Sequence, residues 1–387
     1  MNNHPFADPS LAKRCRNERR FRRLLMLSLV FTLGFIIFFM FDMVSRAAPA
    51  FKHAYIEVEV TYTERATRFP QTMLDKDLQS LVSRSWLRTV PGQLAEAPEL
   101  IGTTEKRWVL TDDQVDQFLK GHHHNLDEAE QADVLSMQQN GKIESRWNLP
   151  FLVNGDSKMP ELAGIASAAL GSVLTLIVTM AFAFPLGVAT AIYLEEFARD
   201  SWVSHMIEAN INNLAAIPSI LYGLLGLAVF INLFGLPRSS PLVGGLTLAL
   251  MTLPIIIVSS RAALRSVPAS IRQAGYGLGL SKLDIVKDHV LPVAMPGILT
   301  GSIIGMAQAM GETAPLIIVG MIAFVPDSSW SFTEAATVLP AQIYTWAGMP
   351  ERAFLEKTAA GILVMLSILV SLNGAAIYLR KRYEFKW

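Results

Sequence analysis

Six long stretches without Asp, Lys or Arg, and with a single Glu, most constrain how this 387-residue chain folds. A bilayer core of about 30 Å is crossed by about 20 apolar residues in helical form. The stretches therefore predict six membrane-spanning helices in an all-α membrane protein. Composition agrees, because 51% of the residues are apolar, 17% are charged and the mean hydropathy is +0.36. The stretches cover residues 24–41, 165–194, 211–236, 242–260, 290–325 and 358–379, and the glutamate is Glu312.

Basic residues outside these stretches predict the topology. Lys and Arg gather on the cytoplasmic side of membrane proteins, which places the N-terminus there, and six spans return the C-terminus to the same side. The formal net charge is zero, which gives no indication of nucleic acid binding. The clusters are Lys13, Arg14, Arg16, Arg19, Arg20, Arg22 and Arg23 before the first stretch; Arg261, Arg265, Arg272, Lys282 and Lys287 between the fourth and fifth; and Arg380, Lys381, Arg382 and Lys386 after the last.

A cleaved signal peptide is the alternative for the first stretch, because Ala48-Pro49-Ala50 resembles a cleavage site. The apolar run is longer than the usual signal-peptide core of about 7–15 residues. Its removal would leave five spans and an external C-terminus, so we expect a retained helix at residues 24–44, after a basic leader at 1–23. Cys15 is the single cysteine and forms no disulfide within the chain.

Residues 45–160 are mostly polar and predict a small α+β domain on the periplasmic side, before a transmembrane domain at 161–387. Residues 56–63 alternate apolar and polar side chains, which predicts a strand with one buried face. Thr111-Asp-Asp-Gln114 has capping-box spacing and predicts a helix start, and Asn140-Gly141 predicts a tight turn. The role of this domain is not evident from its sequence.

We expect neither a metal site nor a catalytic site in this chain. His122, His123 and His124 are consecutive and cannot all face one ion on a regular element, so they predict a solvated loop. No nucleophile has an evident base nearby. No phosphate-binding loop and no intramembrane proton relay are recognisable. If the chain transports a solute, a separate partner must supply the energy.

Between the fourth and fifth stretches, residues 261–292 predict two short helices. One covers 271–279, and Gly279 suits its left-handed stop. Ser281-Lys-Leu-Asp284 has capping-box spacing and starts the other. Their apolar residues are too sparse to span a membrane but sufficient to dock in a partner's groove. A helix pair resting on lipid headgroups is the alternative.

This link resembles the EAA loop of ABC importer permeases, with the family spacing kept throughout. The resemblance implies a coupling helix that docks on a cytoplasmic ATPase, which would bind ATP and Mg²⁺ itself and leave no cofactor in this chain. The sequence departs from the family pattern at Gln273, Gly275 and His289, where Glu, Ala and Ile are usual. The residues we assign to the coupling loop are Gln273, Ala274, Gly275, Gly279, Leu283, Leu291 and Pro292.

Two further segments resemble the A-type subunit of bacterial phosphate permeases. They are Gly311-Glu-Thr-Ala-Pro-Leu316 and Ile217-Pro-Ser-Ile-Leu-Tyr-Gly-Leu-Leu-Gly226, and Tyr193-Leu-Glu-Glu196 also fits. The resemblance covers about residues 160–385. It implies the type I ABC importer fold in the bacterial inner (plasma) membrane, with inorganic phosphate as substrate. The implied partners are a homologous sister permease, a dimeric ATPase and a periplasmic phosphate-binding protein.

Glu312 is a candidate site residue on physical grounds, because an acid in mid-membrane costs several kcal/mol unless it is paired, protonated or hydrated. Pro315 interrupts the helix near Gly311, and Thr313 with the freed amides suits an anion. The alternative is that Glu312 caps or braces the broken helix. Gln308 stands where phosphate permeases carry Arg, so we expect the sister subunit to supply the positive charge and the periplasmic binding protein to provide selectivity. The predicted pathway residues are therefore Gln308, Gly311, Glu312, Thr313 and Pro315.

Two other functions remain open at this point. A permease for sulfate, molybdate or a phosphonate would share most of these features. A membrane sensor would use the external domain to detect a ligand but would not need the coupling loop.

Overall fold

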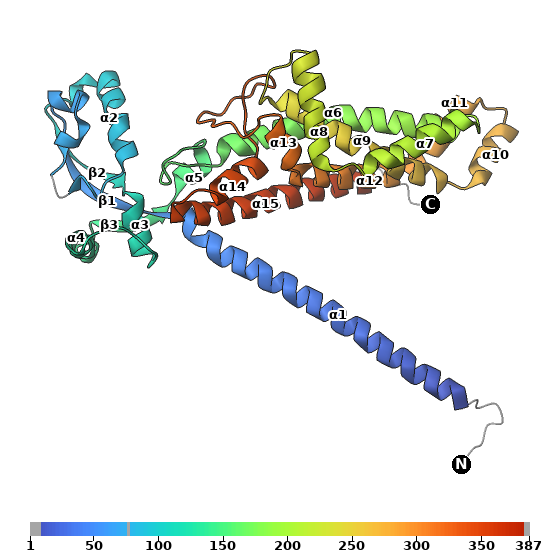
Figure 1. Ribbon diagram of the computed structural model, residues 1–387, viewed down its shortest axis with the longest axis horizontal. Helices are drawn as coiled ribbons and strands as arrows, with labels where there is room; N and C mark the ends of the chain where they lie inside the picture. The colour runs from blue at the N-terminus through green and yellow to red at the C-terminus, as the bar shows by residue number, and fades with distance from the viewer. Residues whose placement is uncertain (1–8, 76–77, 383–387) are drawn as a thin grey trace.

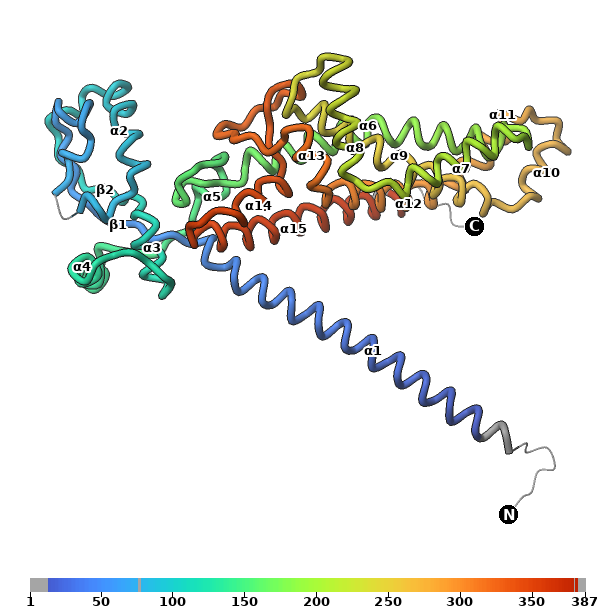
Figure 2. Tube along the Cα trace, viewed as in Figure 1, coloured from blue at the N-terminus to red at the C-terminus, as the bar shows by residue number. Residues whose placement is uncertain are grey.

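The computed structural model describes residues 9–75 and 78–382 and places them in two parts, a sheet domain and a helical part, between which the chain passes twice (Figure 1). A small sheet domain, residues 52–147, stands at one end of a long helical bundle. Helix α1 (Pro9–Ala47) precedes the sheet domain and runs away from the bundle at an angle, as the tube in Figure 2 shows. None of the residues in its apolar window is buried, whereas lipid would cover such a surface in a membrane.

The sheet domain is α+β, with strand β1 (Lys52–Thr61) at the centre of an antiparallel sheet of order β2-β1-β3. Tyr55 pairs with Leu110 on one side, and Ile56 pairs with Ile143 on the other. Ile56, Val58 and Val60 are buried, which confirms the predicted alternation. The other elements are η1 (Ala48–Phe51), η2 (Glu64–Thr67), η3 (Pro70–Met73), α2 (Arg84–Glu96), η5 (Pro98–Leu100), β2 (Thr104–Leu110), α3 (Asp113–Leu119), α4 (Glu128–Gln139) and β3 (Ile143–Trp147).

Two local predictions in this domain need correction. The residue that caps α3 is Asp112, whose carboxylate accepts the Gln114 amide at 3.1 Å, and not Thr111. Thr111 is buried instead and donates its hydroxyl to the Ala54 carbonyl. The histidine run is not simply solvated, because His122 lies 2.8 Å from a carboxylate of the helical bundle. The turn at Gly141 is confirmed by a positive φ of 69°.

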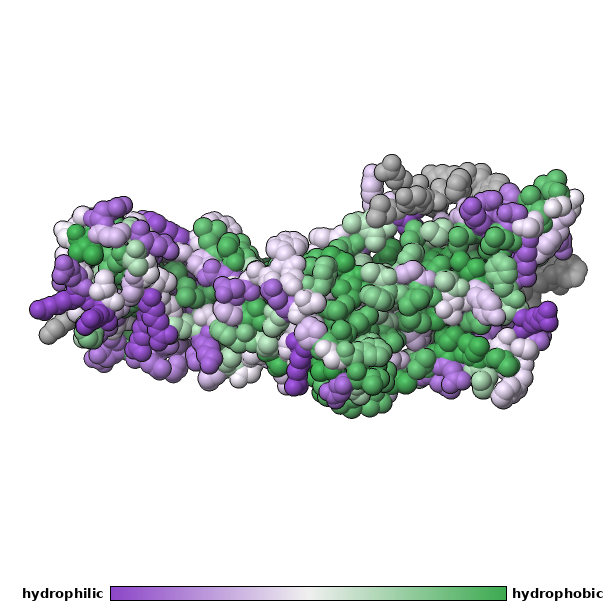
Figure 3. All heavy atoms as spheres, turned by 90° about the horizontal axis from the view of Figure 1, so that it is seen from above, coloured by the Kyte–Doolittle hydropathy of each residue, from purple (hydrophilic) through white to green (hydrophobic). Residues whose placement is uncertain are grey.

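The bundle is built on α6 (Ala166–Ile192), α9 (Pro241–Arg265) and α12 (Leu291–Gly311), which pack side by side. Small residues allow this approach: a Cβ at Gly245 would lie 2.5 Å from the Val178 side chain. The remaining elements are α5 (Leu149–Val153), η6 (Tyr193–Phe197), α7 (Trp202–Ala215), α8 (Ser219–Gly226), η7 (Leu227–Leu233), α10 (Ala269–Gly277), α11 (Lys282–Asp284), η8 (Ile285–Val290), α13 (Ala314–Ile318), α14 (Leu339–Ala347) and α15 (Arg352–Arg382). Apolar side chains cover much of the bundle face in Figure 3, whereas the sheet domain is mainly polar.

Within the described ranges, five helices are long and apolar enough to cross a membrane, or six if one bent helix pair counts as a single span. The third predicted span is not one straight helix, because residues 202–215 and 219–233 meet at 103°. Pro218 lies at that break and has no amide hydrogen with which to continue the helical ladder. The fifth predicted span is too long, since α12 ends at Gly311.

The start of α1, the α10–α11 link and the end of α15 lie at the same end of the molecule, opposite the sheet domain (Figure 1). The sheet domain and the α10–α11 link therefore lie at opposite ends of the bundle.

Candidate functional site

The predicted coupling loop folds as two helical pieces at the far end of the bundle. Helix α10 stops just before Gly279, which takes a φ of 78°, a left-handed conformation that a residue without Cβ adopts readily. The Ser281 side chain then accepts the Asp284 amide at 3.3 Å and caps α11. The π-helix η8 continues directly into α12 through Leu291 and Pro292, both half-buried. The local predictions for Gly279 and Ser281 are therefore confirmed.

One face of this loop is exposed and partly apolar. Leu278 and Leu283 are 79% and 63% exposed, and Tyr276 is also exposed. Gln273 and Ala274 lie on the exposed part of α10 as well. Apolar side chains at the tip of a short helix pair form a surface that suits a groove in a partner.

Gly275 faces the opposite way and is buried. A Cβ atom there would lie 2.6 Å from Cγ1 of Ile285, closer than side chains pack. The glycine therefore lets η8 lie directly against α10. The close contact with Ile285 gives a physical reason for glycine at position 275, where the EAA-loop pattern has alanine.

Ion pairs fasten the loop to the membrane-spanning helices. Arg272 of α10 donates through Nε to both oxygens of Glu196 at 3.2 and 3.3 Å and also pairs with it through Nη2. The same guanidinium donates to the carbonyls of Val267 at 2.9 Å and Leu264 at 3.0 Å, at the end of α9. Glu196 is buried on the π-helix η6, so loss of one partner would leave an unpaired charge in a buried site, which is costly.

A second pair of arginines extends the network along α9. Arg265 donates to both carboxylate oxygens of Glu195 at 2.9 Å. Arg261 lies 3.4 Å from Glu195 and also pairs with Glu208 of α7. From the sequence, these arginines indicated only the topology, and their pairing with acids was not predicted. Two adjacent acids, Glu195 and Glu196, directly follow the apolar stretch 165–194 on the side of the membrane where the arginines are expected, and they could have indicated the pairing.

The predicted helix break lies at the other end of α12. Helix α12 ends at Gly311, Glu312 is extended with φ −80° and ψ 123°, and α13 starts at Ala314. Gln308 and Gly311 are exposed, whereas Glu312 and Thr313 are half-buried. Among residues 9–75 and 78–382, no hydrogen bond or ion pair reaches the Glu312 carboxylate, so the structure gives no support to a capping or bracing role.

Close packing on α8 fixes the position of this break. A Cβ at Gly223 would lie 2.8 Å from Cα of Pro315 and 2.9 Å from Cβ of Ile318. Gly226 lies as closely against Thr247 of α9. Pro315 is buried in this contact. The two sequence segments that resemble phosphate permeases are thus in direct contact, although almost 90 residues separate Gly223 from Gly311 in the chain.

One pocket of the bundle has a lining that does not suit an anion. A pocket of about 280 Å³ between α6, α12 and α15 is lined by Met180, Phe184, Leu299, Ser302, Ile303, Met306 and Ala376. This lining is almost entirely apolar and does not match the solvation that a multiply charged anion requires. Gln308, by contrast, faces the outer surface of this single chain.

Comparison with known proteins identifies relatives for most of the chain. Residues 183–385 match the family model of the binding-protein-dependent transport system inner membrane component, and residues 8–72 and 64–128 match a domain of unknown function. The phosphate transport system permease protein PstA 1 of Mycobacterium tuberculosis (strain CDC 1551 / Oshkosh) is 32% identical over 218 residues, which is 56% of this chain and 70% of that protein.

Two further relatives and one solved structure are also similar to part of this chain. PstA of Mycobacterium leprae is 35% identical, and PstA of Yersinia pestis is 31% identical. The matches cover 56% and 57% of this chain, and 72% and 74% of those proteins. A chain of an inward-facing MetNI methionine ABC transporter matches at 16% identity and a TM-score of 0.44, over 56% of this chain and 95% of its own.

Proposed function

The chain belongs to the family of binding-protein-dependent transport system inner membrane components, and from this premise we propose that it is a permease subunit that imports inorganic phosphate. In this proposal it is not an enzyme, because ATP and Mg²⁺ are bound by a dimeric ATPase in the cytoplasm. A homologous sister permease completes the membrane part. A phosphate-binding protein delivers the substrate from the periplasm.

The coupling loop carries the proposal. It presents Leu278 and Leu283 to a partner, while Arg272 fixes the same helix to Glu196 at the end of α6 and η6. A surface that binds a partner and is rigidly joined to spanning helices can convert the partner's closure into movement of those helices. Neither a passive lipid anchor nor a simple sensor needs this combination.

Phosphate is proposed as the substrate because relatives above 30% identity are phosphate transport permeases by name, and because the two corresponding sequence segments pack together here. We place the pathway along the exposed surface near Gln308 and Glu312, where the sister permease would close it. The sister subunit then supplies the cation that this surface lacks, and Glu312 pairs with it. From the basic clusters we infer that both termini and the coupling loop lie on the cytoplasmic side of a bacterial inner membrane.

Uptake of labelled phosphate tests the proposal in cells that lack their own importer and express this chain with its three presumed partners. We expect ATP-dependent uptake that excess phosphate suppresses and excess sulfate, molybdate or phosphonate does not. Leu283→Asp should abolish uptake and recovery of the ATPase with the permease. Leu135→Asp changes a similarly exposed leucine in the sheet domain and should leave ATPase recovery unchanged.

Each outcome has a distinct meaning. Uptake suppressed by another oxyanion would replace phosphate as the substrate. An ATPase that stays bound to Leu283→Asp would refute the coupling surface.

A further inference from the structure

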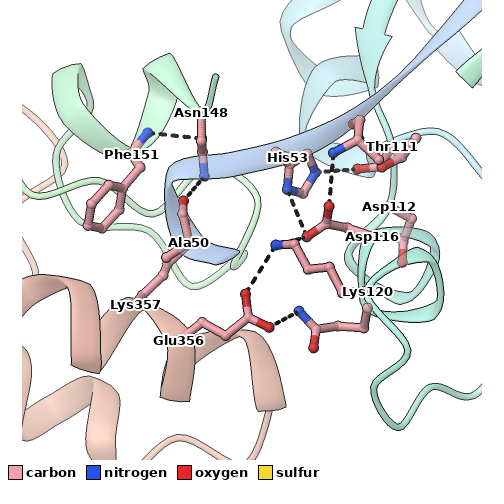
Figure 4. Close-up of polar contacts among 12 residues, drawn as sticks. Ala50, His53, Thr111, Asp112, Asp116, Lys120, Asn148, Phe151, Glu356 and Lys357 are labelled. Atoms are coloured by element: carbon pink, nitrogen blue, oxygen red, sulfur yellow. Dashed lines mark hydrogen bonds and ion pairs between the residues drawn. The ribbon is translucent and has the colours of Figure 1, made fainter. Parts of the chain in front are cut away.

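A chain of buried and half-buried ionisable groups joins the sheet domain to the second turn of α15 (Figure 4). Lys120 of α3 lies 2.6 Å from Asp116 and 3.1 Å from Glu356 of α15. His53 of β1 lies 3.4 Å from Asp116, and His122 lies 2.8 Å from Glu356. Basic and acidic groups thus alternate in the order His53, Asp116, Lys120, Glu356 and His122. We call these five residues the relay. The proposed transport function does not account for it.

Both ends of the relay need protons on imidazole nitrogens. In His53, which is 3% exposed, one ring nitrogen faces the Thr111 carbonyl at 3.3 Å and the other faces the Asp116 carboxylate. A carbonyl and a carboxylate only accept hydrogen bonds, so an imidazolium serves both and a neutral ring serves one. In His122, Nδ1 faces the Glu356 carboxylate and the Gln117 amide oxygen at 3.2 Å.

The relay fixes the charge of its central carboxylate. Burial alone would raise the pKa of Asp116, but His53 and Lys120 outweigh burial and lower this pKa to about 2. Asp116 also accepts the Ala54 amide at 2.9 Å, which ties α3 to β1. The carboxylate is therefore ionised at any physiological pH and depends on its basic neighbours.

Other ionisable groups face the relay from each element around it. Asp113 of α3 is buried without a partner among the described residues, and burial, together with Asp116 and Glu161, raises its pKa to about 7. Glu161, before α6, accepts the Ser83 hydroxyl at 2.8 Å. Lys357 of α15 is buried and donates to the Ala163 carbonyl. Farther out, burial raises the pKa of Asp112, the half-buried cap of α3.

The balance of charge in this buried region changes with pH. With both imidazoles protonated and Asp113 neutral, four basic groups face three carboxylates. With both imidazoles neutral and Asp113 ionised, two basic groups face four carboxylates. Because burial raises the pKa of Asp113 to about 7, its part of this change falls near neutral pH. The excess charge grows from one to two as pH rises, and unbalanced charge is costly where water is excluded, so rising pH weakens the contact.

The helix at which the relay ends leads to the candidate pathway. Met365, Ile368 and Leu369 of α15 pack against the same core cluster as Ala309 and Met310, directly before the break at Gly311. Glu356 lies about two and a half to three and a half helical turns earlier on α15, roughly 13–20 Å along a straight helix. A shift of the start of α15 is thus carried along a rigid element to the end of α12.

We propose that the relay is a proton-sensitive latch that holds the sheet domain on α15 at mildly acidic external pH and releases it as pH rises. The permease thereby gains a response to external pH through groups that do not contact its substrate. The proposal does not depend on which oxyanion is transported.

Hydrogen exchange of the purified full chain in lipid nanodiscs tests the latch without any transport measurement. Protection of α3 and of the second turn of α15, which contains Glu356, is measured at pH 6 and pH 8 and corrected for the intrinsic exchange rate. We expect protection in both segments to fall at least tenfold from pH 6 to pH 8. In His53→Gln/His122→Gln, we expect low protection at both pH values and less than a twofold difference.

His123→Gln and His205→Gln are the matched controls. His123 is the exposed neighbour of His122, and His205 forms an exposed pair with Asp200 at 2.8 Å on α7. Both controls should keep the wild-type change. His122→Gln alone alters only the half-buried end of the relay and serves if the double variant does not fold. Equal wild-type protection at both pH values, or a double variant that retains the wild-type change, would overturn the latch.

Discussion

Gly275 and Gly277 form a matched pair that tests the packing of the coupling loop. Both lie on α10, two residues apart, and alanine should favour the helix at either position by up to about 1 kcal/mol. They differ in what a methyl group would meet. At 277 nothing lies within 4 Å, whereas at 275 the new Cβ would lie 2.6 Å from Cγ1 of Ile285.

The difference between the two variants follows from this contact. A separation of 2.6 Å is about 0.9 Å short of the ~3.5 Å at which carbon atoms pack best. Ile285 is 1% exposed and cannot swing into solvent, so η8 must shift instead. Inserting a methyl group into a filled core costs about 1–3 kcal/mol. Gly275→Ala should therefore be less stable than Gly277→Ala by about that amount.

Thermal unfolding of the full chain in nanodiscs measures this difference, and uptake in the assembled importer measures its consequence. We expect Gly277→Ala to match or exceed wild type in both assays. Gly275→Ala should melt at a lower temperature and transport less per ATP hydrolysed, because displacement of η8 moves the start of α12. In an Ile285→Ala background, adding Gly275→Ala should become neutral or stabilising. Equal effects of the two alanines in the wild-type background would refute the reasoning.

Three further predictions concern charged residues. Arg272→Met leaves the buried Glu196 unpaired and should cost about 3–5 kcal/mol in unfolding experiments, whereas Arg272→Met/Glu196→Met should recover part of that loss. The pKa of Asp113 is raised from 3.8 to about 7 in the folded chain, so the folded state holds this proton more tightly than the unfolded state does. The stability of the fold that depends on this proton is fully present below about pH 4 and is lost as pH rises through 7. Asp113→Asn should therefore stabilise the chain by roughly 4 kcal/mol at pH 8 and by almost nothing at pH 4, seen as a pH-dependent gain in melting temperature. Glu312→Gln should lower phosphate uptake about tenfold, equivalent to ~1.4 kcal/mol, while leaving ATPase recovery intact, and unchanged uptake would remove Glu312 from the pathway.

Local features of the fold were predictable where neighbouring residues determine them. Gly279 stops α10 because a left-handed residue is needed there, and Ser281 caps α11 through an amide three residues away. The alternation in β1 likewise depends on one strand with one buried face. Thr111 and Asp112 are both good caps, and the sequence could not decide between them. The choice follows from the distant Ala54 carbonyl, which engages the Thr111 hydroxyl.

Contacts between distant segments could not be predicted in this way. The pairing of Arg272 with Glu196 joins residues 76 positions apart, and hydropathy alone does not distinguish paired arginines from topology markers. The link from His122 to Glu356 joins two parts of the chain that the sequence presents as separate domains. The sharp bend at Pro218 was missed for a related reason, because residues 211–236 are uniformly apolar and hydropathy does not report direction.

Helix α12 connects the two candidate sites by itself. Its 21 residues span roughly 30 Å, from the end of η8 at the coupling loop to the break at Gly311. The first end is held by the contact of Ile285 with Gly275, and the second continues into Pro315, which packs on Gly223. Because neither contact leaves space for a methyl group, α12 cannot shift at one end without a response at the other. Gly223→Ala, although far from the coupling loop, should therefore also lower the amount of substrate moved per ATP hydrolysed.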